Sequence, residues 1–280
     1  MSRTQVALLT ALAMIAFAGN SLLCRMALLH TRIDAASFTS IRLLAGALVL
    51  WLIVAAKGGK IGAAGSWASA LALFAYAAAF SFAYVSLSAA TGALLLFGAV
   101  QTTMISAGLW KGERFQGQQL AGLLLAVGGL LALLLPGLSA PPLLPAMLML
   151  GAGFSWGIYS MRGKNGANPI EITAGNFVRA VPFAALLSLA MLSRCSVDGR
   201  GTLYAVASGA LASGVGYAIW YTALRGLKAT TAATVQLSVP VIAALGGVAL
   251  LGEAITPRLL ITSAAILGGI ALITLATRRN

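Results

Sequence analysis

Residues that could perform acid–base or metal chemistry are scarce in this chain of 280 residues, which holds five carboxylates and one histidine, His30. All of them lie in or beside predicted connections between apolar segments. Glu113 and Glu253 each follow a glycine, which commonly closes a helix, so we interpret them as acids at helix ends. Proton-driven carriers usually place a titrating group inside the membrane. We therefore expect no catalytic residue, no proton relay within the membrane, and no metal or other cofactor.

Arg42 and Arg179 are positioned differently, about six and eight residues inside predicted apolar spans. At the rise of a helix this depth is roughly 9–12 Å, where an unpaired cation costs around 3 kcal/mol on some scales. Two interpretations are open. Either the long side chains reach the interface or bond to carbonyl groups at helix ends, or they act in gating and attract an anionic group of a substrate.

Aromatic side chains recur at helical spacing in several predicted spans, where residues three or four positions apart share a face. Such stripes often form interfacial belts or contacts between helices, but belts lie at span ends. Tyr76, Trp156 and Tyr217 fall nearer the middle, which favours the lining of a cavity, with helix packing as the alternative. Aromatic faces with a few amides suit an amphipathic organic molecule. The predicted substrate-binding residues are Tyr76, Phe80, Gln101, Trp156, Tyr217 and Gln236.

The composition indicates the environment in which these residues lie. Hydrophobic residues make up 60% of the chain and charged residues 8%, whereas soluble domains carry charge at about a quarter of their positions. Water cannot solvate such a surface, so much of it must face lipid. The net charge of +13 does not indicate a nucleic-acid-binding protein, because the basic residues stand singly or in pairs between apolar runs and do not cluster on one face.

Apolar runs divide the chain into ten segments of about the length that crosses a bilayer, roughly 20 residues each. The first begins like a cleavable signal peptide, but its apolar character continues to Leu29, so we predict a spanning helix. The distribution of Lys and Arg favours both termini in the cytoplasm. The predicted fold class is an all-α integral membrane protein, with spans at 5–28, 36–56, 67–87, 91–110, 117–135, 143–161, 171–192, 202–224, 230–251 and 257–276.

The sequence repeats itself at an offset of 140 residues, half its length. Gly112-Glu113 aligns with Gly252-Glu253, and Gly128-Gly129 aligns with Gly268-Gly269, without gaps. Each half holds five predicted helices, an odd number, so the second half must insert upside down relative to the first. Inverted repeats are the architecture of many secondary transporters, and chance similarity between glycine-rich apolar stretches is the alternative. We predict two domains, 1–140 and 141–280.

Both copies resemble the EamA repeat of the drug/metabolite transporter superfamily. Two matching sets of residues carry the resemblance: Pro240, Leu251-Gly252-Glu253 and Gly268-Gly269 in the second copy, and Lys111-Gly112-Glu113 and Gly128-Gly129 in the first. The resemblance implies a secondary transporter that exports small organic metabolites. Aromatic positions such as Tyr76, Tyr159 and Trp220 are similar to those of bacterial inner-membrane exporters of aromatic amino acids. This resemblance implies aromatic amino acids as substrates and the bacterial inner membrane as the location. Val100 departs from the family repeat, which often carries proline there.

Helix-breaking and small residues mark further candidate positions. Pro240 lies at the centre of the ninth predicted span, where a missing backbone hydrogen bond provides either a hinge or a static kink. The glycine pairs indicate tight helix packing, either within the chain or at the interface of a homodimer. The rival functions are a drug or other metabolite carrier of the same superfamily, a channel or accessory subunit, and a membrane-embedded enzyme. The enzyme is the least supported, because no nucleophile and base face each other within the spans.

Overall fold

The computed structural model describes residues 1–59, 64–110, 117–135, 137, 140–163, 168–227, 232 and 235–276, and the regular structure within them is entirely helical. The first half of the chain contains α1 (Arg3–His30), α2 (Ala35–Ala56), α3 (Trp67–Tyr84), α4 (Ala89–Trp110) and α5 (Gly117–Leu134). The second half contains α6 (Leu143–Gly163), α7 (Pro169–Ala190), η1 (Leu192–Arg194), α8 (Gly199–Ala207), η2 (Ser208–Val215), α9 (Gly216–Leu224), α11 (Ser238–Leu251) and α12 (Pro257–Ala276).

Short polar side chains and one glycine define several helix boundaries. Side-chain oxygens of Ser2, Asp34, Ser66 and Asp198 accept hydrogen bonds from backbone N–H groups in the first turns of α1, α2, α3 and α8, which is the N-cap arrangement. Gly252 ends α11 with a left-handed φ of 64°, a conformation that glycine adopts without steric cost. The helix ends therefore follow from the alternation of apolar runs with short polar residues.

The outward faces of the helices are apolar. Eight helices within the described residues are long and apolar enough to cross a membrane, and two shorter apolar helices, Ser238–Leu251 and Pro257–Ile273, accompany them. Leu8, Leu48 and Leu186 are each more than half exposed, a surface that is unfavourable in water and suited to lipid. Trp67 and Trp110 are also exposed, at helix ends, where aromatic belts form. The protein is a multi-pass membrane protein.

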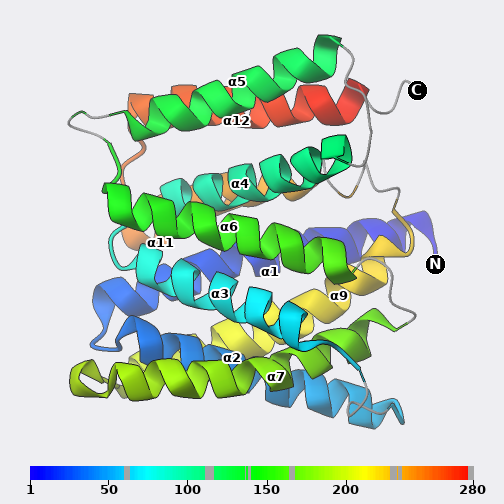
Figure 1. Ribbon diagram of the computed structural model, residues 1–280, viewed down its shortest axis with the longest axis vertical. Helices are drawn as coiled ribbons and strands as arrows, with labels where there is room; N and C mark the ends of the chain where they lie inside the picture. The colour runs from blue at the N-terminus through cyan, green and yellow to red at the C-terminus, as the bar shows by residue number, and fades with distance from the viewer. Residues whose placement is uncertain are drawn as a thin grey trace.

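The helices of the two halves of the chain pack against one another. Figure 1 shows α5 beside α12 at one end of the longest axis and α2 with α7 at the other, while α1, α3, α6 and α9 lie between them. The contacts recur when the halves are exchanged: α3 packs on α6 as α9 packs on α1, and α4 packs on α6 as α11 packs on α1. The start of α1 and the end of α12 lie at the same edge of Figure 1.

Adjacent glycines of α5 and α12 divide into packed and open positions. A Cβ atom on Gly269 would lie 2.7 Å from the backbone nitrogen of Ala126 on α5, and Gly129 faces α12 with similarly little room. Gly128 and Gly268 have no atom within 4 Å of such a Cβ. Tight helix packing is therefore confirmed for Gly129 and Gly269, and it joins two helices of the same chain.

Two of the predicted spans are not continuous α-helices. The eighth consists of α8, the π-helix η2 and α9, and π segments commonly occur at functional sites. Here η2 brings Gly209 against the backbone carbonyl of Arg42, with no room for a side chain between them. In the ninth span α11 begins at Ser238, so Pro240 lies in its first turn and not at the centre of a helix. The first turn of a helix does not need the N–H that proline lacks, so the proline is accommodated there, and its role as a hinge or a static kink stays a prediction.

Candidate substrate-binding site

Aromatic residues from four helices meet near the centre of the bundle. The ring centroid of Trp156 on α6 lies 4.8 Å from that of Tyr76 on α3 and 5.0 Å from that of Tyr217 on α9. Phe17 of α1 packs edge-on against Tyr217, with 5.8 Å between the centroids. Phe80, one turn further along α3, contacts Tyr76. The stripes that the sequence placed on separate helices therefore form one cluster, to which both halves of the chain contribute.

Two adjoining cavities lie beside this cluster and share Phe17, Trp156 and Tyr217 in their walls. The larger cavity has a volume of about 140 Å³, and its wall also contains the amides Gln101 and Gln236. The smaller cavity has a volume of about 20 Å³, which is room for about one water-sized group. Together they form an aromatic cavity with polar side chains at intervals along its wall.

The structure brings all of the predicted substrate-binding residues to these two cavities. Tyr76 and Phe80 line the smaller one, Gln101 and Gln236 line the larger one, and Trp156 and Tyr217 line both. A role of these residues in substrate binding stays a prediction. Phe17 was not predicted from the sequence, although a signal was present. Phe17 lies three residues before Asn20, so the two share a face of α1, and both line the smaller cavity.

A polar network lies behind the aromatic wall, around Arg42 of α2. Arg42 Nη2 donates a hydrogen bond of 3.0 Å to Tyr76 Oη, and Arg42 Nε donates one of 3.3 Å to Ser213 Oγ in η2. The guanidinium carbon lies 5.1 Å from the ring centroid of Tyr76 and 4.9 Å from that of Phe80, within the range of cation–π attraction. Asn20 Nδ2 also donates to Tyr76 Oη, at 3.1 Å. All of these partners of Arg42 are electrically neutral.

The two arginines within predicted spans have different environments. Arg42 is only 1% exposed, so its side chain does not reach the interface. Arg179 donates from Nη1 to the carbonyl oxygens of Ala64 and Gly175 and lines neither of the two aromatic cavities. The interpretation of bonding to backbone carbonyls therefore fits Arg179, whereas Arg42 is the one beside the candidate site. Gating or anion attraction by either residue stays a prediction.

Of the two carboxylates related by the repeat, Glu253 follows the end of α11 and forms an ion pair with Arg25 of α1, with 3.0 Å between Arg25 Nε and Glu253 Oε1. Its interpretation as an acid at a helix end is confirmed, but its ion pair with a residue in the other half of the chain was not predicted. Glu113, with its neighbours Lys111 and Gly112, lies outside the described residues.

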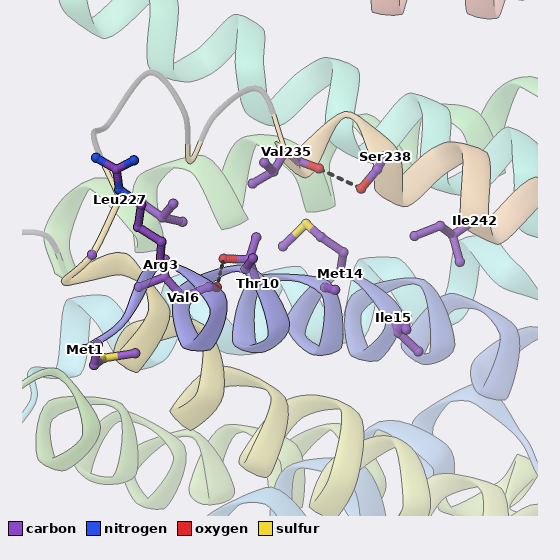
Figure 2. A pocket seen from close by; sticks show the side chains of 13 residues that line it. Met1, Arg3, Val6, Thr10, Met14, Ile15, Leu227, Val235, Ser238 and Ile242 are labelled. Atoms are coloured by element: carbon purple, nitrogen blue, oxygen red, sulfur yellow. Dashed lines mark hydrogen bonds between the residues drawn. The ribbon is translucent and has the colours of Figure 1, made fainter.

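A groove of about 730 Å³, larger than the two central cavities, lies between the first half of α1 and the start of α11 (Figure 2). Figure 2 shows apolar side chains such as Met14, Ile15 and Ile242 along it. The Thr10 hydroxyl donates to the carbonyl of Val6 in its own helix, so its proton is not available to a ligand. None of the predicted substrate-binding residues lies in this groove, which is therefore less suited to a specific metabolite than the central cavities.

Fold and cavity together define a multi-pass α-helical membrane protein with a central aromatic site. The chain belongs to the EamA-like transporter family, whose model matches residues 4–135 and again residues 143–275. It is thus a member of a family of membrane transporters, and the resemblance carried by the glycine–glutamate motifs is confirmed.

One relative matches nearly the whole chain, and two others match about half of it. The chain is 60% identical over 267 residues to the Pseudomonas aeruginosa protein "Uncharacterized protein PA1977", covering 95% of this chain and 93% of that one. It is 32% identical to the threonine/homoserine exporter RhtA of Escherichia coli, over 48% of this chain and 46% of RhtA. It is 31% identical to a probable amino-acid metabolite efflux pump of the same organism, over 52% of this chain and 54% of the pump. One solved protein structure is 20% identical, with a TM-score of 0.70 over 99% of this chain and 100% of its own, which shows a shared fold.

Proposed function

We propose that this transporter is a carrier that exports small organic metabolites, chiefly aromatic or other apolar amino acids, across the bacterial inner membrane. The observation that carries the proposal is the cluster of Tyr76, Trp156 and Tyr217 beside a cavity of about 140 Å³. Lipid tails already solvate aromatic carbon, so ring packing between membrane helices gains little hydrophobic energy. An alternately exposed cavity gives the rings a substrate to stack on, at about 0.5–1.5 kcal/mol per pair.

The proposed architecture is ten spans in two inverted halves of five, 1–140 and 141–280, with both termini in the cytoplasm. Two observations support it. The family model matches the chain twice, once in each half, and the helix contacts recur when the halves are exchanged. Inverted halves supply an outer and an inner gate from one sequence plan, which is what alternating access to a central site requires.

In this orientation the larger cavity extends toward the cytoplasm. Its wall reaches Gly163 and Leu224, the last residues of α6 and α9. The adjacent Arg162 and Arg225 belong on the cytoplasmic side under the positive-inside rule. An exporter must load its substrate from the cytoplasm, so this arrangement suits the loading step of the cycle.

The start of α11 is the proposed hinge. The described chain is not helical at Leu237, directly before α11, and Pro240 lies in the first turn. Interrupted helices of transporters commonly flank the binding site, and Gln236, in the cavity wall, stands one residue before the break. A change of angle at the break would therefore move Gln236 relative to the cavity.

A second substrate class, small polar amino acids, is favoured by the name of one relative, a threonine/homoserine exporter. The name of a second relative, a probable amino-acid metabolite efflux pump, does not distinguish between the two classes. Each matches only about half of this chain, and the aromatic cavity wall favours the first class. The remaining alternatives are a drug carrier of the same superfamily and a channel or accessory subunit. Catalysis is not part of the proposal.

Counterflow in liposomes tests the carrier and its substrates together. Vesicles that contain the purified chain and unlabelled phenylalanine should transiently accumulate labelled phenylalanine from outside, because a carrier exchanges substrate whereas a channel only dissipates the gradient. A panel with tyrosine, leucine, threonine and homoserine ranks the substrate classes. Absence of counterflow for the whole panel would refute the proposal, and a preference for threonine would select the second class.

The proposed topology has its own test in cysteine labelling of intact bacteria. Cys195 is exposed and Cys24 is buried, so a membrane-impermeant maleimide should label the native chain at Cys195 from the outside. In a Cys195→Ser background, a cysteine introduced at Lys57 should react only after the membrane is permeabilised. Labelling of both positions from the same side would contradict the inverted arrangement.

A further inference from the structure

Arg42 is a buried cation with an incomplete set of partners. It is 1% exposed. Its Nε and Nη2 donate to hydroxyl groups, while Nη1 has no hydrogen-bond partner among the residues that the structure describes. Buried polar groups are nearly always hydrogen-bonded, and buried charges are nearly always paired. Among the described residues, Arg42 therefore lacks a partner for Nη1 and a carboxylate as counter-charge.

The described carboxylates are engaged elsewhere. Glu253 pairs with another arginine at the end of α11. Asp34 and Asp198 cap α2 and α8, and Glu171 lies in the first turn of α7. In the described part of the chain, the neighbours of Arg42 are hydroxyl groups, ring faces and the buried thiol of Cys24, and none of them is a carboxylate. None of the described carboxylates supplies the anion that would complete this environment, which leaves room for the anionic group of a bound molecule.

Tyr76 connects Arg42 to the cavity. The Tyr76 hydroxyl accepts hydrogen bonds from both Arg42 and Asn20, so its own O–H can donate to the neighbouring Tyr217 hydroxyl or to a ligand that takes its place. The Ser208 hydroxyl in η2 donates to Asn20 Oδ1 at 2.6 Å, which orients the amide with Nδ2 toward Tyr76. Tyr76 and Asn20 both line the smaller cavity. The smaller cavity therefore presents hydrogen-bond donors next to an uncompensated positive charge.

We infer that the smaller cavity binds the carboxylate of the transported molecule and that Arg42 is the residue that selects it, an inference that rests on the proposed function. The volume of about 20 Å³ has room for about one water-sized group, such as one carboxylate oxygen, while the larger cavity takes the rest of the molecule. Arg42 does not line the cavity, so it acts by polarising Tyr76 and through its charge, which is weakly screened in a low-dielectric interior. The substrate class is then amino acids and other small carboxylic acids. Amides, alcohols and amines of the same skeleton are excluded.

The test compares compounds that differ only in the carboxylate. In counterflow assays with the wild-type chain in liposomes, phenylalanine and leucine should compete at least about tenfold better than phenylalaninamide and leucinamide, a difference of ~1.4 kcal/mol. Arg42→Gln should lower this selectivity ratio to near unity, and Arg42→Lys, which keeps the charge, should retain most of it. Tyr76→Phe keeps the ring and removes the hydroxyl, so it should also lower the ratio.

The matched control is Arg194→Gln, which removes an exposed arginine of η1 and should leave the ratio unchanged. A merely structural role of Arg42 would lower transport of acid and amide forms alike, so an unchanged ratio in Arg42→Gln overturns the inference. If that variant does not insert, an unchanged ratio in Tyr76→Phe overturns it. If the wild-type chain transports acids and amides without preference, the inference is refuted while the proposed function stands. Absence of counterflow for every acid refutes the proposed function and the inference with it.

Discussion

Arg25 and Glu253, 228 positions apart in the chain, form an ion pair with 3.0 Å between Arg25 Nε and Glu253 Oε1. Glu253 Oε2 also accepts a hydrogen bond of 2.7 Å from the N–H of Ala89, the first residue of α4. Arg25 Nη1 donates to the carbonyl oxygens of Tyr84 and Val85 at the end of α3. The pair therefore ties α1, α3, α4 and α11 together at the end of the bundle opposite to the mouth of the larger cavity.

Removing the charge of Glu253 should destabilise this end of the bundle. Glu253→Gln keeps an acceptor for the N–H of Ala89 but leaves Arg25 without a counter-charge. Because both side chains are about one-tenth exposed, we expect a loss of about 1–3 kcal/mol, measured as a lower unfolding temperature in detergent.

The matched control is Glu171→Gln, an acid in the first turn of α7 that contacts Asn168 near the surface. It should change the unfolding temperature much less. Equal unfolding temperatures for wild type and Glu253→Gln would show that the pair contributes nothing to stability.

The contribution of Asp34, which caps α2 and accepts a hydrogen bond from the N–H of Ser196, to the stability of the protein should depend on pH. Burial by itself would raise the pKa of the Asp34 carboxyl, but hydrogen bonds from Ser196, Ser37 and Ala36 outweigh it and lower the pKa from its ordinary value of 3.8. A carboxyl whose pKa is lowered by folding stabilises the protein above its unfolded pKa, and this contribution is lost as the pH falls through the folded pKa. We therefore expect the unfolding temperature of the wild type to fall below about pH 4 more steeply than that of Asp34→Asn. Parallel pH profiles for the two proteins would contradict this assignment.

The sequence predicted where the helices begin and end much better than it predicted which side chains contact one another. Apart from the start of α11, every predicted span begins and ends within three residues of a helix or continuous helical stretch in the structure, because apolar runs and polar caps are local signals. The aromatic cluster was predictable because Tyr76, Trp156 and Tyr217 lie far from the ends of their predicted spans. The pairing of Arg25 with Glu253 was not, since each appears in the sequence as an ordinary charge near a span end. The π-helix η2 was also missed, because its glycines and serines are equally compatible with an α-helix.

Gly268 and Gly269 are neighbours with opposite environments, so they make a matched pair of test sites. A Cβ on Gly269 would press against the backbone of α5, whereas Gly268 faces open space. We expect Gly269→Ala to destabilise the protein by about 1–3 kcal/mol, as overpacking typically does, and Gly268→Ala to be neutral or slightly stabilising. Unfolding temperatures in detergent compare the two. If Gly268→Ala were the more damaging, its outward face would have to pack on something else, such as a second copy of the chain.

Trp156 should determine how well the carrier distinguishes aromatic from aliphatic substrates. Its ring contacts both Tyr76 and Tyr217 and lines both central cavities. Trp156→Ala should lower the apparent affinity for phenylalanine about tenfold or less, since one decade is ~1.4 kcal/mol, and should affect leucine less because aliphatic side chains do not stack. Competition in the counterflow assay measures both affinities.

The matched control is Phe154→Ala, two residues away on the same helix but 55% exposed, which should leave both affinities unchanged. Wild-type flux for every substrate after replacing Trp156 and Tyr217 together would refute the aromatic site. The membership in a transporter family would stand after such a result, but the assignment of aromatic amino acids as substrates would not.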